Sequence, residues 1–417
     1  MAHILFRHRD IPDIHKLEVY QANGGYEGFK KALSMQPSEV IDVVKASNLR
    51  GRGGAGFPTG LKWSFIPKAP GDKYVLINTD ESEMGTFKDR ILIEKNPHQV
   101  IEGALIAAYA IGAKLVFNYC RGEFMDAGYA FEEALLECRE AGIIGENILG
   151  SGFTCQFYTY YGAGAYICGE ETALIKSLEG ELGQPWSKPP FPAIEGLYAK
   201  PTVVNNTETL ANVPAIIVNG AEWYTKMGTP QSPGPKLMCL SGHINNPGVY
   251  EIEMGSLTYR ELLFDEKYGG GIPGDKKFKA MLPVGGSGPM VTEAALEAPI
   301  TYEGLKPFGS DMGSGSVVVM DETVDIPWVA MKLAHFFKHE SCGKCTPCRE
   351  GTYWIDKLLT RINHGEGTAE DLQTLQSVAS QIGGRTLCAL GDFAISPVAG
   401  TYRHFADEFK AKVNGNH

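Results

Sequence analysis

The chain of 417 residues is predicted to be an α/β protein, in which a domain built on a parallel sheet precedes two smaller units. Three observations support this fold class. Strand-like and helical segments alternate between residues 73 and 179, as in a parallel sheet covered by helices. Short β patterns dominate residues 236–325, and helical patterns follow from 327. The predicted domains are therefore 1–235, 236–326 and 327–417.

The first domain is predicted to begin with a helix over 36–47, followed by a glycine-rich loop over 51–60. The predicted strands cover 73–80, 114–120 and 154–161, and the helices between and after them cover 96–111, 123–141 and 169–179. A proline-rich stretch over 181–201 has no element signals, and its length suggests a functional loop. A helix over 205–219 and a linker over 229–236 end this domain.

The second domain is predicted to be a small mixed β unit, with strands within 236–254, 279–286 and 316–320 and one short helix over 258–263. Four helices are predicted to form a C-terminal bundle, over 328–338, 348–362, 369–382 and 397–412. Ser396 and Pro397 suit the start of the last helix, and Gly383 suits the residue that follows the third.

Composition excludes several classes of function. A net charge of −11 leaves no basic surface for nucleic acid. The sequence has no long apolar run, and charge interrupts its start too early for a signal peptide, so neither membrane insertion nor export is expected. Nine cysteines should then be reduced. Those that stand singly are expected to be small buried hydrophobic residues: Cys120, Cys138, Cys155, Cys168 and Cys239.

The remaining cysteines form the most informative pattern. Cys342, Cys345 and Cys348 are spaced at steps of three, and an isolated Cys388 follows forty residues later. Four sulfur ligands suit a [4Fe–4S] cluster, for which ferredoxins use the same opening motif. Zinc is the competing occupant, but it usually takes two separated cysteine pairs, or cysteine with histidine. Thiols that merely pack have no reason to crowd beside Lys344 and Arg349.

The glycine-rich loop contains the pattern G-x-G-x-x-G at 51–56. A dinucleotide fingerprint must follow a strand and open a helix, whereas here a helix precedes the loop and Pro58 interrupts the continuation. Glycine amides can still bind phosphate, and Lys62, Phe57 and Phe65 add a charge and two aromatic rings. A phosphate or dinucleotide loop is therefore favoured over a structural turn.

Polar residues also follow the predicted strands, where ligands bind in open α/β sheets. Asn78, Asp80, Glu81 and Glu83 come after the first strand, although a solvated acidic loop is the alternative. A glycine-rich segment over 162–171 ends the third strand and opens a helix with two glutamates, which also suit a helix dipole. Asn205 and Asn206 precede another helix and could simply cap it.

Three long motifs together resemble one family: RGRGGAGFPTGLKW at 50–63, GAGAYICGEETAL at 162–174 and ESCGKCTPCREG at 340–351. They are similar to those of the NADH-binding flavoprotein (51 kDa, or F) subunit of respiratory complex I, and the resemblance spans essentially the whole chain. It implies FMN and one [4Fe–4S] cluster as cofactors, with NADH as the substrate. It also implies a Rossmann-like parallel-sheet domain, a β-grasp (ubiquitin-like) domain and a four-helix bundle that holds the cluster.

The resemblance further implies roles for particular residues. Those expected to bind FMN are Gly51, Gly53, Lys62, Asn78, Asp80, Tyr166, Gly169, Glu170, Asn205, Asn206 and Thr209. Those expected to bind NADH are Phe57 and Phe65, which would stack the adenine, with Glu83, Glu171, Lys188 and Phe191. The cluster ligands would be Cys342, Cys345, Cys348 and Cys388. No protein acid or base is expected, because the flavin itself takes a hydride and releases single electrons.

The implied partners are a thioredoxin-fold [2Fe–2S] subunit (24 kDa, or E) and the large iron–sulfur subunit, which pass electrons towards quinone. The implied location is the peripheral arm of a membrane-bound complex, on the cytoplasmic or matrix side. The nearest alternative is the diaphorase subunit of an NAD-linked hydrogenase or formate dehydrogenase, which often has extra ferredoxin-type cysteine sets. A zinc-stabilised interaction module without catalysis is an alternative of another class.

Two residues depart from the pattern of the family. Met84 stands where the family usually has proline, and Lys176 stands where it usually has Glu or Asn. Because methionine does not fix φ as proline does, the loop from Asp80 to Gly85 is expected to rearrange more freely. An exposed substitution without consequence is the other interpretation of Met84.

Overall fold

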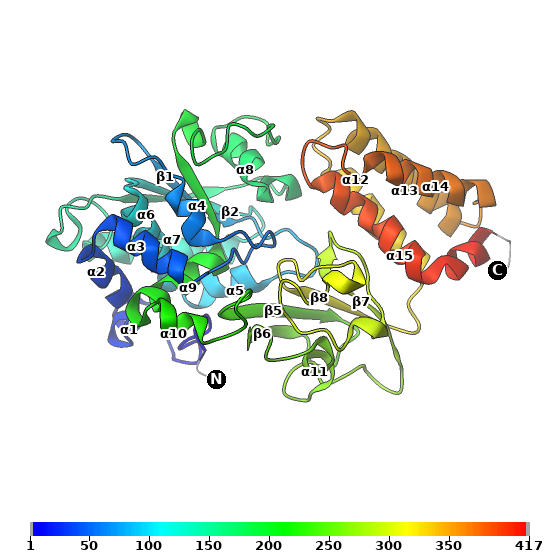
Figure 1. The fold of residues 1–417 in the computed structure, drawn as a ribbon, viewed down its shortest axis with the longest axis horizontal. Helices are drawn as coiled ribbons and strands as arrows, with labels where there is room; N and C mark the ends of the chain where they lie inside the picture. Colours follow the sequence, from blue (N-terminus) through cyan, green and yellow to red (C-terminus); the bar gives the residue numbers. More distant parts are fainter. Residues whose placement is uncertain (1–2, 414–417) are drawn as a thin grey trace.

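The computed structural model describes residues 3–413. Figure 1 shows three regions along the chain: an α/β region drawn in blue to green, a second sheet in green to yellow, and C-terminal helices in orange to red. Within residues 3–413, no helix combines the length and the apolar character that crossing a membrane requires. The five singly placed cysteines are all buried, as expected.

The first sheet has four strands in the order β3-β2-β1-β4, and all neighbouring pairs are parallel. The strands β1 (Tyr74–Thr79), β2 (Leu115–Cys120) and β3 (Gln156–Tyr161) confirm the prediction. The strand β4 (Thr202–Asn206) was missed, because its few residues directly follow an irregular loop and precede a clear helix. The predicted helix over 205–219 therefore begins at Thr207, and Asn205 and Asn206 belong to the strand.

Helices pack around this sheet. Those predicted from the sequence are α3 (Pro37–Ala46), α6 (Pro97–Ile111), α7 (Met125–Glu140), α8 (Glu171–Leu178) and α9 (Thr207–Asn219). Five shorter ones were not predicted: α1 (Leu17–Ala22), α2 (Glu27–Leu33), α4 (Thr59–Ser64), α5 (Lys88–Lys95) and α10 (Ala221–Thr225). Short helices give too few turns for a clear apolar period.

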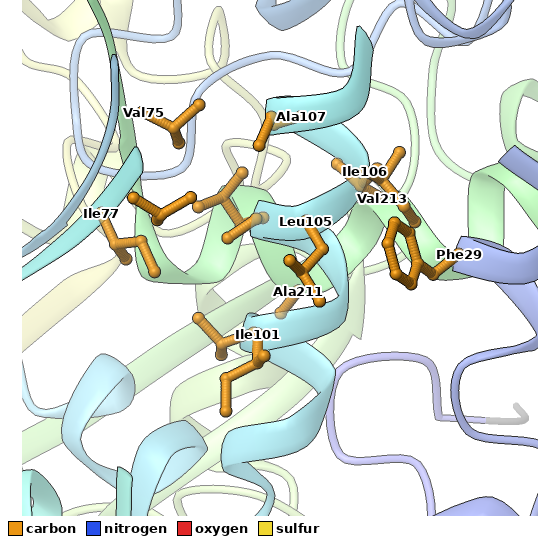
Figure 2. Packing of buried hydrophobic residues seen from close by; sticks show 14 of the residues in the cluster. Phe29, Val75, Ile77, Ile101, Leu105, Ile106, Ala107, Ala211 and Val213 are labelled. Carbon is orange, nitrogen blue, oxygen red and sulfur yellow. The ribbon is translucent and has the colours of Figure 1, made fainter. Parts of the chain in front are cut away.

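The helix α6 lies at the centre of the core. Figure 2 shows its side chains between Val75 and Ile77 of β1 on one side and Phe29 of α2 on the other. Gly103 lets α9 approach closely, since a Cβ at this position would lie 2.1 Å from the carbonyl oxygen of Leu210. The close packing of α6 against β1 and α9 thus makes this side of the sheet rigid.

The second sheet is mixed, in the order β6-β5-β8-β7. Its strands are β5 (Pro235–Gly242), β6 (Gly248–Glu253), β7 (Phe278–Gly286) and β8 (Ser316–Asp321), with the helix α11 (Tyr259–Phe264) packed near them. Only the central pair, β5 and β8, is parallel. The predicted β patterns and the short helix are all present.

The C-terminal helices are α12 (Ile326–Glu340), α13 (Thr346–Asn363), α14 (Ala369–Ile382) and α15 (Leu390–Val413). The predicted start of the last helix at Ser396 and Pro397 is wrong, because Pro397 lies inside α15. The helix begins at Leu390, whose buried side chain continues the apolar face of Ala394 and Val398. The left-handed residue after α14 is Gly384, with φ of 66°, rather than Gly383.

Candidate functional site

The carboxyl ends of the four parallel strands bring several predicted residues to one edge of the sheet. The Asn78 amide, at the end of β1, donates a 2.8 Å hydrogen bond to the carbonyl of Gly169, in the segment after β3. Asn205, at the end of β4, accepts a 2.8 Å bond from the indole of Trp63 in α4. The end of β1 therefore meets the segment after β3, and α4 meets the end of β4, at the strand edge where ligands bind in open α/β sheets.

The glycine-rich loop lies beside this edge, between α3 and α4. The amide of Arg52 donates to the hydroxyl of Thr209 at 2.8 Å, and a Cβ on Gly53 would lie 3.0 Å from that of Asn206. Gly54 has a φ of 124°, which only glycine adopts readily. Within residues 3–413, the amides of Gly53 and Gly54 have no protein acceptor, which leaves them available to an anionic group.

Arg52 does not face this edge. Its guanidinium is fully buried and donates to the hydroxyls of Tyr224 and Tyr302 and to the carbonyls of Arg50 and Pro233. Its charge therefore holds the glycine-rich loop against neighbouring parts of the chain and is not available to a ligand.

Sequence reasoning missed the residue that orients Asn206. The Asp89 carboxylate accepts a 2.6 Å hydrogen bond from the Asn206 amide, while the amide oxygen of Asn206 caps α9. Lys88 pairs with Asp89 at 2.8 Å and with Glu208 at 2.9 Å, and all three side chains are buried. Lys88 and Asp89 begin α5, more than a hundred residues before Asn206, so only the fold brings them together.

A second group of charges surrounds Glu171. Its carboxylate pairs with Lys62 at 2.8 Å and with Lys188, from the proline-rich loop (residues 181–201), at 2.6 Å. Burial alone would raise the pKa of Glu171, but the two ammonium groups outweigh it and lower the pKa to about 2. Glu170 caps α8 by accepting bonds from the amides of Thr172 and Ala173. The predicted FMN and NADH residues thus share one charge network.

Two further acidic residues of the loop after β1, Asp80 and Glu83, are partly buried. Burial raises the pKa of Asp80 to about 7, against the opposing effect of Arg121, so this carboxyl can donate as well as accept hydrogen bonds near neutral pH. Burial also raises the pKa of Glu83. The Glu83 carboxylate accepts a 2.8 Å bond from the hydroxyl of Tyr166 and a 3.1 Å bond from the amide of Ser287.

Met84 is half-buried, not exposed. A Cβ on Gly286 would lie only 1.9 Å from the Met84 methyl carbon, so the two residues are packed together at the end of β7. Leu333 of α12 also lies close to Gly286. The expectation that Met84 is exposed is therefore wrong, and its side chain ties the loop after β1 to the second sheet.

The predicted stacking residues are exposed. Phe57 and Phe65 are 45% and 49% exposed, and their ring centroids lie 6.2 Å apart with an interplanar angle of 49°. A base held between them needs parallel rings roughly 7 Å apart, or twice a carbon–carbon contact of about 3.5 Å. The separation of the two rings is close to this value, but one ring must rotate before they become parallel. Phe191, on the proline-rich loop, is also exposed.

The four predicted cluster cysteines line one pocket, with Ile167, Pro185, Ser341, Lys344, Leu387 and Leu390. Cys348 lies in the first turn of α13, as expected. Burial raises the pKa of the Cys388 thiol to about 11. Binding to a metal centre would deprotonate it. In residues 3–413, no group of three or more histidine, cysteine or acidic side chains is already arranged around a metal position. Each thiolate of a four-iron cluster can bind a different iron atom.

These residues suit the two implied groups. The unpaired amides of the glycine-rich loop, Lys62 and the carboxyl of Asp80 offer phosphate and hydroxyl partners of the kind that FMN needs. The pocket of four thiols suits an iron–sulfur cluster. A parallel-sheet cofactor site next to such a pocket defines a flavin-dependent iron–sulfur oxidoreductase.

Comparison with known proteins supports this class of oxidoreductase. Residues 44–215 match the Nuo51 FMN-binding domain, and residues 328–412 match the NADH-ubiquinone oxidoreductase-F iron–sulfur binding region. The chain belongs to the family of NADH-quinone oxidoreductase F subunits, with FMN and a [4Fe–4S] cluster as cofactors and NADH as the substrate.

The relatives are similar over almost their whole length. The chain is 51% identical to an NADH-quinone oxidoreductase F subunit of Rhizobium meliloti, over 98% of this chain and 97% of the relative. It is 48% identical to the corresponding F subunit of Mycobacterium tuberculosis, over 99% and 94%.

Two solved structures of an NAD⁺-reducing [NiFe]-hydrogenase are also similar. The H₂-reduced form has a TM-score of 0.85 and 36% identity, and it covers 93% of this chain and 64% of the other. The air-oxidised form has a TM-score of 0.83 and 34% identity, and it covers 98% and 66%. The chain thus spans about two thirds of the hydrogenase chains that it matches.

Proposed function

We propose that this chain is the NADH-oxidising subunit of a respiratory complex I, and that electrons from NADH leave it through the cysteine pocket for partner subunits and finally quinone. One observation supports this most directly. Ile167 lines the cysteine pocket, while its neighbours Tyr166 and Gly169 face the edge of the parallel sheet. One short segment therefore forms part of both sites, and electrons would have little distance to cross.

FMN, when bound, accepts a hydride from NADH and releases electrons one at a time to the cluster. Our assignment of FMN contacts is the set expected from the sequence: Gly51, Gly53, Lys62, Asn78, Asp80, Tyr166, Gly169, Glu170, Asn205, Asn206 and Thr209. Asp89 would hold the Asn206 amide in place through its 2.6 Å bond. The buried Lys88 pairs with Asp89 at 2.8 Å and fixes its position.

The nucleotide would lie over the exposed side of the same edge. Phe57 and Phe65 would stack the adenine, and Phe191 and Lys188 would approach from the proline-rich loop. Glu83 and Glu171 are already held by hydrogen bonds and ion pairs, so they would orient the nucleotide and not exchange protons with it. Cys342, Cys345, Cys348 and Cys388 would each bind one iron atom of the cluster.

We also propose that the domains are 1–235, 236–326 and 327–417, with the second a β-grasp unit and the third a four-helix bundle. The buried residues of β5, β6 and β8 with α11 form one apolar cluster, which supports a core of its own for the second domain. Another cluster joins α12, α13, α14 and α15, and it also includes residues of β7.

The proposed partners are the thioredoxin-fold [2Fe–2S] subunit and the large iron–sulfur subunit, in the peripheral arm of the complex. The likeness to an NAD⁺-reducing hydrogenase favours a second candidate, the diaphorase subunit of a related assembly. The higher identity to the F subunits, at 51% and 48%, supports complex I.

The test is to purify the chain without oxygen, together with whatever subunits accompany it. We expect the yellow absorption of flavin, a broad iron–sulfur band that NADH bleaches, and a reduced-cluster EPR signal. Mass spectrometry of the associated chains separates the two candidates, since a hydrogenase subunit would point to the diaphorase. A colourless protein that contains zinc would refute both.

A further inference from the structure

The proline-rich loop is hydrogen-bonded directly to the loop that contains the first two cluster cysteines. The side-chain amide of Gln184 donates to the carbonyl oxygen of Cys342 at 2.9 Å. In the opposite direction, the ammonium of Lys344 donates to the carbonyl oxygen of Pro185 at 2.7 Å. Pro185 also lines the cysteine pocket itself. These two bonds fix the position of one loop relative to the other.

The same loop reaches the charge network around Glu171 only a few residues later. Lys188 pairs with Glu171 at 2.6 Å and with Glu170 at 3.5 Å. Lys188 lies three positions after Pro185, which is at most about 11 Å of extended chain. Because so few residues separate the two, a displacement of the Lys188 backbone is transmitted to Pro185.

The segment between these two points is itself held. The amide of Trp186 donates to the hydroxyl of Thr172 at 3.2 Å, and its indole donates to the carbonyl of Pro190 at 2.9 Å. The indole bond ties Trp186 to Pro190 within the loop, and the amide bond links the same segment to α8, which begins with Glu171. Thr172 belongs to α8, directly after the two glutamates.

We infer that Gln184 and Lys344 are positioning residues that couple nucleotide binding to the surroundings of the iron–sulfur cluster. This inference rests on the proposed function. A dinucleotide brings an anionic pyrophosphate near Lys188. The pyrophosphate then competes with the Glu171 carboxylate for the Lys188 ammonium. The resulting shift of the proline-rich loop passes through Pro185 and Gln184 to the backbone of Cys342. Coupling of this kind is reciprocal, so the state of the cluster also alters nucleotide affinity.

The test compares the full chain, loaded with FMN and cluster and fully reduced with dithionite, with and without ADP-ribose. This nucleotide has no nicotinamide to react, and in the fully reduced protein the cluster gives the EPR signal. We expect ADP-ribose to change the reduced-cluster EPR spectrum. We also expect hydrogen exchange of the amides in 341–346 to change by about fivefold, the lower end of typical coupling between sites.

Two substitutions remove one bond each while keeping the size of the side chain: Gln184→Met and Lys344→Met. Each should reduce the response of the spectrum to ADP-ribose, whereas Lys344→Arg, which can still donate to Pro185, should retain it. Lys357→Met is the matched control, since Lys357 lies over the ring of Tyr353 at 5.5 Å and not at the loop.

The inference is overturned if ADP-ribose, shown to bind by a change in flavin fluorescence, leaves the wild-type spectrum and the exchange of 341–346 unchanged. It is also overturned if both Met variants respond as fully as the wild type. If a Met variant fails to hold its cluster, the inference is still tested by the wild type and by Lys344→Arg, each compared with and without ADP-ribose. A protein without flavin and iron refutes the proposed function instead.

Discussion

The hydroxyl of Tyr166 lies 2.8 Å from the carboxylate of Glu83, to which it donates a hydrogen bond. This bond joins the segment after β3 to the loop after β1. The second oxygen of Glu83 accepts the amide of Ser287, which follows β7 in the other sheet. Ser287 in turn accepts a bond from the hydroxyl of Ser396 in α15. A carboxylate that we assign to NADH binding is thus held by contacts from separate parts of the fold.

Tyr166→Phe should weaken NADH binding by about tenfold, the equivalent of about 1.4 kcal/mol, because Glu83 loses one of its two fixed partners. Titration of the oxidised, flavin-loaded protein with ADP-ribose measures the effect without turnover. Tyr109→Phe is the control, because its hydroxyl bonds to the carbonyl of Met35, away from the site. Equal affinities in both variants would mean that the bond to Tyr166 does not position Glu83.

Phe65→Ala should weaken nucleotide binding by about 5–150-fold, since stacking of an aromatic ring on a base is worth roughly 1–3 kcal/mol. Flavin content should not change, because the ring is exposed. Tyr129→Ala removes a similarly exposed ring from α7 and serves as the control. Loss of FMN from the Phe65 variant would show instead that the ring packs the flavin site.

Cys388→Ala should leave FMN bound and abolish the reduced-cluster EPR signal, because the pocket would have three sulfur ligands. Iron analysis and EPR of the reduced protein measure the outcome. Cys239→Ala is the control, since Cys239 is buried in β5 outside the pocket and should leave the signal intact. Four irons and an unchanged signal in the Cys388 variant would show that another residue is the fourth ligand.

Met84→Pro should alter affinity for NADH, because the loss of the Met84 side chain frees the contact with Gly286 beside Glu83. Proline would restrict φ, which contributes roughly 0.4–1 kcal/mol of stability where the native φ suits it. Unfolding temperatures and nucleotide titrations of Met84→Pro and Met84→Leu separate the loss of the side-chain contact from the restriction of φ. Leucine keeps most of the packing and does not restrict φ as proline does. Unchanged affinity in both variants would mean that this contact has no bearing on the nucleotide.

His98 should make the protein less stable in mild acid. Burial lowers its pKa from 6.5 to about 4, although Glu137, at 3.2 Å, opposes this. Below pH 6.5 the unfolded chain therefore binds a proton that the folded chain refuses, and stability falls as pH drops towards 4, by about 1.4 kcal/mol per pH unit. His98→Gln should reduce this dependence. Unfolding temperatures between pH 5 and 7.5 measure it, and parallel curves for both proteins would contradict it.

Local patterns in the sequence were enough for much of the fold and for the type of cofactor. The alternation from residue 73 to 179 predicted the strands β1, β2 and β3 and the helices α6, α7 and α8, because each of these elements has its own apolar period. The short β4 and the start of α15 at Leu390 were not predicted. The asparagines before α9 suggest the start of that helix, although they end β4. The Ser396–Pro397 pair suggests the start of α15, although the helix begins at Leu390. Burial, which only the folded chain shows, decides both cases.

The sequence by itself determined the ligand chemistry: the spacing of three cysteines, the density of glycine at 51–56 and the polar residues after each strand. Only the tertiary structure decided which distant groups meet. It places Asp89 against Asn206, Lys188 on Glu171, and Gln184 on the carbonyl of Cys342. The reason is physical, since spacing along a chain defines contacts only within a few residues, whereas these pairs depend on how packed sheets and helices orient their loops.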